Sequence, residues 1–341
     1  MRYIRKLPEP ETILKEYPLD KKYYSLRKEF ISNIKDVLSG RSKRKLILVG
    51  PCSADNEEAI LDYVKRLAKL QKEVEEKIMI VPRVYTTKPR TTGEGYKGIL
   101  HNQNALSNKE NILEGIKTVR QLHLRVIEET GFFVADEMLY PEVTAYISDL
   151  LGYVTIGARS VENQQHRLVA SGFDMPVGIK NPTSGDSAIM FNAIGAAQNP
   201  HEIFFGGYEV QTEGNKYAHA ILRGYTGSNG IATPNYHYEN LINIYDQYLK
   251  NDYQNIAIIV DCNHSNSNKN FIEQIRIAKE IFDNCKKYSN INKFIKGLMI
   301  ESYIEDGTQM IGNNIYGKSI TDPCLGWEKT EELIKDLYNI I

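Results

Sequence analysis

The sequence has no apolar run long enough to cross a membrane, since no stretch approaches about 18 uncharged apolar residues. Its first residues, MRYIRKLPEPETILKEYPL, are charged and interrupted by proline, so they lack the apolar core of a secretory signal peptide. Four cysteines in 341 residues, without a CxxC pair, do not form a disulfide framework. We therefore expect a protein of the reducing cytoplasm that has no membrane partner.

Neither basic nor acidic residues are in excess. The chain has 42 Lys and Arg against 43 Asp and Glu, which gives a formal net charge of −1. Proteins dedicated to nucleic-acid binding usually have a strongly basic balance, so no nucleic-acid partner is expected. Apolar residues make up 42% of the chain, which is ordinary for a globular protein with a large core. A chain that is neutral overall can still have a local cluster of positive or negative side chains.

Short apolar runs alternate along the chain with longer amphipathic segments. Eight of these runs are nearly continuous in apolar residues, as is typical of strands buried on both faces of a parallel sheet. The candidate strands are KLILVGPC (45–52), IMIVPRVY (78–85), FFVADEM (132–138), YVTIGAR (153–159), PVGIKN (176–181), AHAILRG (218–224), NIAIIVDCNH (255–264) and GLMIES (297–302).

The segments between these runs have helical periodicity. In residues 57–76, Ile60, Val64, Leu67 and Leu70 recur at helical spacing. The other candidate helices are 109–129, 142–151, 162–171, 186–198, 237–250, 268–287 and 327–341. Eight strands, each followed by a helix, predict an α/β fold of the (β/α)₈ TIM-barrel type. An open doubly wound sheet is the alternative, but no GxGxxG turn follows the first strand to support it.

Residues 1–44 precede the first strand and include a helical stretch around 20–38, so we interpret them as an N-terminal extension. Residues 45–341 then form the catalytic barrel, and the chain is a single domain overall. A small inserted hairpin is expected between the fifth and sixth strands, at FFGGYEVQ (204–211). Pro82 lacks a backbone donor inside the second candidate strand, which argues against the limits predicted for that strand.

Every candidate strand ends at a residue that can carry chemistry. In chain order these are Cys52, Arg83, Glu137, Arg159, Lys180, Arg223, His264 and Glu301, with Lys88 soon after Arg83 and Asp322 in the loop beyond the last strand. The active sites of barrel enzymes lie at the carboxyl ends of their strands. Because charge beside an apolar run is costly, its presence at all eight ends favours a site over ordinary loop composition.

Four of these residues have the donor atoms of a metal site. Cys52, His264, Glu301 and Asp322 offer one sulfur, one nitrogen and two carboxylates, a set that suits a divalent transition metal with a position open to substrate. Two alternatives stay open at this point. Cys52 packs as a small hydrophobic residue, or it is a nucleophile with His264 as its base.

A second group is cationic and consists of Arg83, Lys88, Arg90, Arg159, Lys180 and Arg223. If they converge on one barrel mouth, these side chains bind small polyanions through charge-assisted and bidentate contacts. Phosphates, or substrates with both a phosphate and a carboxylate, are the natural ligands. For any single member, pairing with a helix dipole or a surface carboxylate is the alternative.

Six motifs together resemble the type I, enteric-like 3-deoxy-D-arabino-heptulosonate 7-phosphate (DAHP) synthases. They are GPCS (50–53), RVYTTKPRT (83–91), GARSVENQQHRLVASGFDMPVGIKN (157–181), ILRG (221–224), DCNHSNSNK (261–269) and YGKSITDPCLGW (316–327). The resemblance implies a TIM barrel that condenses phosphoenolpyruvate with erythrose 4-phosphate and releases phosphate, as the first step toward chorismate and the aromatic amino acids. It also implies one divalent ion of the Mn, Fe, Zn or Co class and a homodimer or homotetramer.

The resemblance assigns roles residue by residue. Cys52, His264, Glu301 and Asp322 match metal ligands, Arg83, Arg159, Lys180 and Arg223 match phosphoenolpyruvate-binding residues, and Pro89, Arg90 and Thr91 match the erythrose 4-phosphate segment. The resemblance also implies that Lys88 bridges toward the aldehyde and that Glu137 lies beside the enolpyruvyl group. Catalytic roles are expected for Lys88, Glu137 and His264, and Asp322 is also expected to contact substrate. Lys88 or a water on the metal is the expected proton donor to the new alkoxide.

The chain departs from the family pattern at YPEVTA (140–145), which lacks the Asp and Pro-Gln of a feedback site, and at Asn263, where serine is common. We therefore expect weak or no inhibition by phenylalanine and tyrosine. The nearest alternative function is that of 3-deoxy-octulosonate 8-phosphate synthase, which uses a five-carbon aldehyde, but KPRT favours the four-carbon sugar phosphate. Two functions of a different class also stay open, a cysteine-dependent hydrolase and a barrel that binds a partner without catalysing a reaction.

Overall fold

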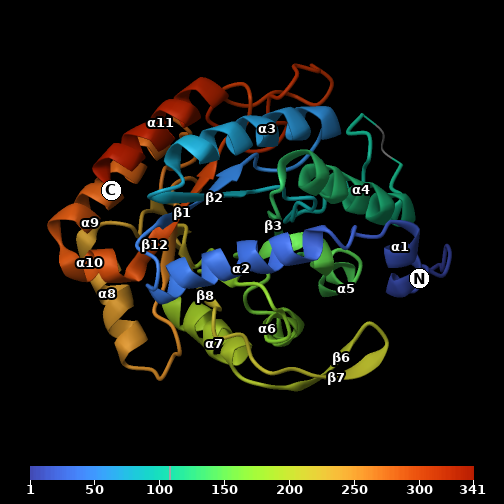
Figure 1. The fold of residues 1–341 in the computed structure, drawn as a ribbon, viewed down its shortest axis with the longest axis horizontal. Coiled ribbons are helices and arrows are strands. Elements are labelled where there is room, and N and C mark those ends of the chain that lie inside the picture. Colours follow the sequence, from blue (N-terminus) through green and yellow to red (C-terminus); the bar gives the residue numbers. More distant parts are fainter. Residues whose placement is uncertain (107–108) are drawn as a thin grey trace.

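The computed structural model describes residues 1–106 and 109–341 and forms a parallel barrel surrounded by helices (Figure 1). Its strands are β1 (Lys45–Gly50), β2 (Ile78–Pro82), β3 (Val134–Glu137), β4 (Leu151–Ile156), β5 (Val177–Lys180), β8 (His219–Leu222), β11 (Ile258–Asp261) and β12 (Ile295–Glu301). They pair in the order β2-β1-β12-β11-β8-β5-β4-β3, and a bridge between Arg83 and Ala135 joins the two ends of this order. The predicted TIM barrel is confirmed.

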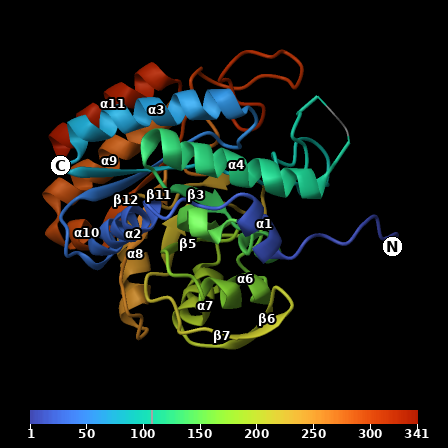
Figure 2. The same ribbon diagram turned by 45° about the vertical axis from the view of Figure 1, so that its right-hand side comes forward.

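The helices of the described chain lie outside the strands, except at the floor of the barrel (Figures 1 and 2). They are α1 (Pro10–Glu16), α2 (Tyr23–Ser39), α3 (Glu57–Val74), α4 (Ile112–Thr130), α5 (Pro141–Thr144), α6 (Gln164–Ala170), α7 (Ser187–Gln198), α8 (Tyr238–Leu249), α9 (Glu273–Lys287), α10 (Ser289–Phe294) and α11 (Trp327–Ile340), with a 3₁₀ turn at Ser148–Leu150. None of these described helices is long and apolar enough to cross a bilayer.

Two apolar layers hold the barrel together. Along β1, Leu46 and Leu48 belong to the cluster inside the barrel, whereas Ile47 and Val49 belong to the cluster between strands and helices. Successive side chains of a strand point to opposite faces, so a strand buried on both faces must be apolar at every position. This explains why the apolar runs of the sequence are continuous.

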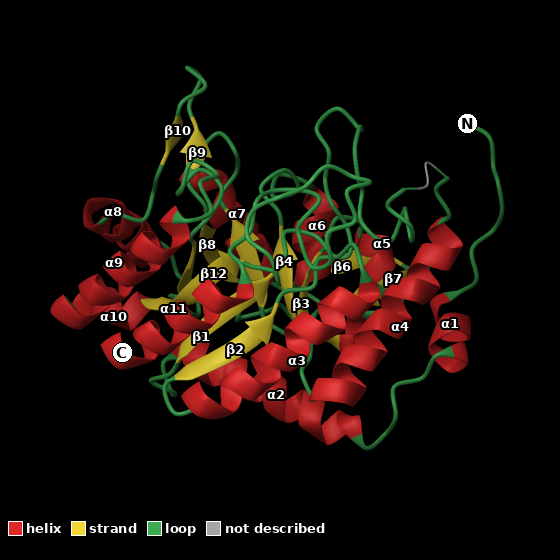
Figure 3. Cartoon of the chain, turned by 90° about the horizontal axis from the view of Figure 1, so that it is seen from above, coloured by secondary structure: helices red, strands yellow, loops and turns green. Residues whose placement is uncertain are grey.

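Helix α2 closes the floor of the barrel at the amino ends of the strands, opposite the loops (Figure 3). Its residues Ile34, Val37 and Leu38 are buried in the same cluster as the inward-facing Leu46 and Leu48. The helix ends at Gly40, whose φ of 79° is the left-handed conformation that glycine adopts without strain. Apolar residues of α2 therefore replace solvent beneath the barrel.

The predicted helix 142–151 is interrupted in the structure. It forms the single turn α5 and then the 3₁₀ turn at Ser148–Leu150. Thr144 Oγ1 donates to the Pro141 carbonyl oxygen at 2.5 Å, which gives the backbone an alternative to continuing the helix. The prediction relied on apolar spacing alone and missed this local competition.

Two smaller expectations are resolved by the structure. The inserted hairpin is present as the antiparallel pair β6 (Glu202–Phe205) and β7 (Tyr208–Gln211), which lies at the edge of the molecule (Figure 2). A second short pair, β9 (Tyr225–Thr226) and β10 (Ala232–Thr233), was not expected. Pro82 is the last residue of β2, so the strand ends three residues before the predicted 85.

Candidate active site

A cavity of about 120 Å³ lies among the loops at the carboxyl ends of the strands. Most of the residues predicted for the site line it, together with several that were not predicted. The lining residues are Arg83, Tyr85, Thr87, Lys88, Pro89, Arg90, Glu137, Ala158, Arg159, Lys180, Thr183, Arg223, His264, Lys269 and Asp322. Cys52 and Glu301 are buried and contact members of this lining, whereas Thr91 is exposed.

The Arg83–Glu301 pair is the buried base of the site. Arg83 Nη2 donates to Glu301 Oε1 at 2.6 Å, and the two side chains are 2% and 0% exposed. Burial opposes the charge of both groups, but each is offset by the other: the pKa of Glu301 is lowered and that of Arg83 is raised. Gly50 leaves room for the Arg83 backbone, because a Cβ there would lie 2.1 Å from the Arg83 carbonyl oxygen.

Three of the four predicted metal ligands form a compact group. Cys52 Sγ, a Glu301 oxygen and an Asp322 oxygen all lie within 4.8 Å of one another. Burial, and then the Glu301 charge, raises the pKa of the Cys52 thiol to about 11, a burden that a bound cation would relieve. This mixed set of sulfur and oxygen donors, buried and rich in negative charge, fits a divalent transition metal.

Lys88 lies against this group of three. Its Nζ donates to Cys52 Sγ at 2.6 Å and to Asp322 Oδ2 at 3.2 Å. Burial disfavours its charge, but Cys52 and Asp322 outweigh burial and raise the pKa of Lys88. Among the described residues, the hydrogen-bond partners of the Cys52 sulfur are Lys88 and Asp322, an arrangement that does not favour a thiol nucleophile with His264 as its base.

His264 stands beside the group of three and is not a member of it. Its Nε2 lies 3.7 Å from Glu301 Oε1, while its Nδ1 lies 2.9 Å from Asp261 Oδ2. Burial lowers the pKa of His264, which favours the neutral imidazole that metals bind. The residue has a φ of 52°, a conformation that is uncommon outside glycine and is often found at functional sites.

The remaining predicted cations extend from the buried end of the site toward its mouth. Lys180 Nζ donates to Asp261 Oδ2 at 3.1 Å, and both side chains are buried. Arg223 is 8% exposed, and burial lowers its pKa. Arg83 Nη1 has no hydrogen-bond partner among the described residues. A buried guanidinium nitrogen without a partner is costly, so it marks a place for an anionic ligand.

The exposed end of the site combines the segment 88–91 with the β4 loop. Arg159 Nε donates to Thr91 Oγ1 at 3.2 Å, and Arg90 Nε donates to the Tyr96 carbonyl oxygen at 2.8 Å. Glu137 enters from the end of β3 and packs against Gly157, where a Cβ would lie 2.5 Å from its Oε1. The predicted residues of both substrate segments therefore share one cavity, with Thr91 at its edge.

Sequence reasoning missed several residues that complete the site. Asp261 is fully buried and contacts both Lys180 and His264. Lys269 pairs with Asp322 at 2.9 Å, and Asn263 Nδ2 donates to Glu301 Oε2 at 2.6 Å. Asp261 also ends a strand, β11, so the rule that identified the other residues would have found it. Asn263, which stands where serine is common in the family, thus holds the predicted metal ligand Glu301 by a hydrogen bond.

Comparison with known proteins decides the family. Residues 21–335 match the family described as "DAHP synthetase I family". The chain belongs to this family. Among its curated relatives, the Tyr-sensitive phospho-2-dehydro-3-deoxyheptonate aldolase of Salmonella typhimurium is 35% identical over 97% of this chain and 92% of its own length. The Trp-sensitive enzyme of Escherichia coli is 34% identical over 99% and 96%.

Solved structures agree with the assignment to the DAHP synthetase I family. The phospho-2-dehydro-3-deoxyheptonate aldolase of Francisella tularensis superposes with a TM-score of 0.91 at 31% identity, over 100% of this chain and 98% of that one. The Thermotoga maritima DAHP synthase has a TM-score of 0.58 at 17% identity over 88% and 69%, which shows a shared fold. The family and the enzyme class predicted from the six motifs are confirmed.

Proposed function

We propose that the cavity at the carboxyl ends of the strands binds phosphoenolpyruvate, erythrose 4-phosphate and one divalent metal ion, and condenses the two substrates to DAHP and phosphate. The observation that carries the proposal is the single cavity that cations of both predicted substrate segments share with Asp322 of the predicted metal group. Family membership supports the same reaction.

The cations provide binding and orientation. Arg83, Lys180 and Arg223 are held at the buried end of the cavity and would take the phosphate and carboxylate of phosphoenolpyruvate. Arg90 and Arg159 lie toward the mouth, where they would take the phosphate of the aldehyde substrate. Holding both molecules in one geometry turns a bimolecular encounter into an oriented reaction.

Cys52, Glu301 and Asp322, with His264 beside them, would hold the metal ion, which when bound supplies Lewis-acid polarisation of the aldehyde. The carbon–carbon bond forms between C3 of phosphoenolpyruvate and the aldehyde carbon. Lys88, which its neighbours keep protonated, gives a proton to the new alkoxide. Water adds at C2, the C2–O bond breaks, and inorganic phosphate leaves.

The decisive experiment compares two aldehydes. Purified protein with Mn²⁺ and phosphoenolpyruvate is assayed for phosphate release with erythrose 4-phosphate and, in parallel, with arabinose 5-phosphate. We expect turnover with the four-carbon aldehyde and little with the five-carbon one, and chelation should abolish it. Preference for arabinose 5-phosphate would contradict the proposal. Activity that survives chelation would also contradict it, because a cysteine-dependent hydrolase does not need a metal.

We also propose the finer points that the resemblance implies. The metal is of the Mn, Fe, Zn or Co class, in keeping with its sulfur and oxygen donors. A cytoplasmic setting is supported by four free, buried cysteines.

A homodimer or homotetramer is supported by the exposed Phe204 and Tyr208 on the β6–β7 hairpin, and sedimentation of the wild type against a Phe204→Ser, Tyr208→Ser variant tests it. We also propose that residues 1–44 are an N-terminal extension of the single catalytic domain 45–341.

Weak or absent feedback inhibition stays a prediction. Segment 140–145 contains the single turn α5, and the cavity beside it is about 10 Å³, room for a water molecule and not for an amino-acid side chain. Initial rates should therefore change little when phenylalanine or tyrosine is added. A clear fall in rate at sub-millimolar concentrations of either amino acid would contradict this.

A further inference from the structure

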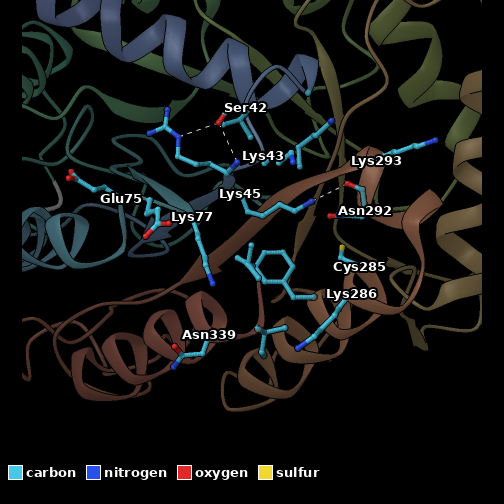
Figure 4. Close-up of a pocket in the computed structure, with 18 of the residues that line it drawn as sticks. Ser42, Lys43, Lys45, Glu75, Lys77, Cys285, Lys286, Asn292, Lys293 and Asn339 are labelled. Carbon is cyan, nitrogen blue, oxygen red and sulfur yellow. Dashed lines mark hydrogen bonds between the residues drawn. The ribbon is translucent and has the colours of Figure 1, made fainter.

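A second cavity lies at the opposite end of the barrel from the active site. Its volume is about 1140 Å³, and it is lined by the amino ends of β1 and β12 and by the carboxyl ends of helices that include α2, α9 and α11 (Figure 4). Seven cationic side chains line it: Lys43, Arg44, Lys45, Lys77, Lys286, Lys293 and Lys296. We call these residues the lower cation cluster.

Few negative groups of the protein offset the positive charges of the lower cation cluster. Among the residues that the structure describes, none of its seven members forms an ion pair with a carboxylate. Two acidic side chains, Glu75 and Glu76, share the lining, and Glu76 accepts a hydrogen bond from Tyr338 Oη. The cations therefore face one cavity with their charge largely unneutralised, which attracts anions.

Two members of the cluster are built into the barrel itself. Lys45 begins β1 and is 5% exposed, and its Nζ donates to the carbonyl oxygens of Asn292 and Ile295, as Figure 4 shows for Asn292. Lys296 lies in β12 and is 9% exposed. Its Nζ is 3.2 Å from where a Cβ of Gly40 would be, so the glycine at the end of α2 leaves room for the amine.

Placing these two ammonium groups together is costly. Burial, and then the charge of Lys45, lowers the pKa of Lys296 to about 8. Lysines near helix carboxyl ends, such as Lys286, are accounted for by the helix dipole. Lys45 and Lys296 lie on strands, but their amines also reach helix ends: Lys45 Nζ donates to the Asn292 and Ile295 carbonyl oxygens at the end of α10, and Lys296 Nζ lies beside Gly40 at the end of α2. The partial charges of helix ends do not neutralise seven full positive charges. An anionic ligand that offsets both charges accounts for the whole cluster.

We propose that the lower cation cluster binds a small molecule carrying two or more phosphate groups. The volume matches a ligand of the size of a sugar bisphosphate or larger, since small-molecule sites measure roughly 300–1,000 Å³. Six of the seven cations are lysines, which contact phosphate as mobile point charges, whereas recognition of a planar carboxylate favours the fork of arginine. Several separate ammonium groups suit several phosphates.

The lower site and the active site are separate but joined by the same strands. Strand β1 runs from Lys45 to Gly50, just before Cys52, and β12 runs from Ile295 to Glu301. At about 3.3 Å per residue, roughly 20 Å separates the two ends of these strands. A ligand in the lower site therefore does not compete with one in the active site.

The test is calorimetric titration of the intact, metal-loaded protein with fructose 1,6-bisphosphate, with phosphoenolpyruvate present in saturating amounts to occupy the active site. We expect one site per chain, with inorganic phosphate binding at least about tenfold more weakly. The double variant Lys286→Glu, Lys293→Glu should weaken binding at least about tenfold, and Lys296→Met should also weaken it. Lys286 and Lys293 are exposed, so their replacement leaves the fold intact.

A matched control carries the same change of net charge elsewhere. Lys28→Glu, Lys250→Glu alters two exposed lysines outside the cavity and should change affinity by less than about twofold. Equal weakening by the two double variants would reduce the effect to overall charge and overturn the proposal. Absence of bisphosphate binding in the presence of phosphoenolpyruvate, or equal affinity for inorganic phosphate, would also overturn it. Because the lower-site variants decide the result, it does not depend on the proposed reaction.

Discussion

The two ends of the barrel each gather cations around a cavity, but they neutralise them differently. At the proposed active site Arg83 pairs with Glu301, and Lys180 pairs with Asp261, in contacts of 2.6 and 3.1 Å between buried groups. At the lower site, the described structure gives no such partner to any of the seven cations. Buried carboxylates hold the cations of the active site in fixed positions, which reaction chemistry requires. The lower site leaves its cations without carboxylate partners, which suits the binding of an anion.

The largest difference is expected between two buried cysteines at opposite ends of the barrel. Cys52→Ala removes a predicted metal ligand and should lower turnover by at least about a hundredfold. Replacing a residue that only hydrogen-bonds to a metal ligand already lowers metal affinity or activity by about 10- to 100-fold. Cys285→Ala, in the lining of the lower cavity, should leave metal content and turnover unchanged. Metal analysis and steady-state rates of both variants check this. Full metal content in Cys52→Ala would refute the ligand assignment.

A smaller but still large effect is expected from breaking a buried pair at the active site. Arg83→Met leaves Glu301 charged and buried without its partner, which should lower the free energy of unfolding by about 3–5 kcal/mol. The double variant Arg83→Met, Glu301→Gln removes the stranded charge and should recover much of this loss. Urea unfolding measures both. If the single variant is as stable as the wild type, the pair does not hold the site together.

The sequence was sufficient to predict the barrel, because continuous apolar runs and helical spacing record burial directly. It also predicted one group of Cys52, His264, Glu301 and Asp322, since the carboxyl ends of parallel strands meet, and the structure brings all but His264 within 4.8 Å of one another. It did not predict the pairing of Lys180 with Asp261, because partners at strand ends depend on the order of strands around the barrel. The lower site was missed because its cations come from segments far apart in the sequence, Lys43 to Lys45 at the start of the first strand and Lys293 with Lys296 at the start of the last, and only the closed barrel brings them to one cavity.

The contrast between paired and unpaired cations is also testable through pH, in the smallest of the expected effects. The pKa of Lys296 is about 8 in the folded protein against 10.5 for an unperturbed lysine, so the folded protein binds the proton of this amine less tightly than the unfolded chain does. The resulting cost in stability is fully present below pH 8 and disappears as the pH rises toward 10.5. Lys296→Met removes that cost and should raise the free energy of unfolding at pH 7 by about 1 kcal/mol, with the gain shrinking toward pH 10.

The same substitution at the active site should have the opposite sign. Lys180→Met takes the amine away from the buried Asp261 and should therefore lower the free energy of unfolding at pH 7. Urea unfolding of the two variants at pH 7 and pH 10 makes the comparison. Loss of stability in Lys296→Met at pH 7 would mean that its ammonium is already compensated within the folded chain. The lower cation cluster would then need no ligand, and the two ends of the barrel would not differ in whether their cations are compensated within the protein.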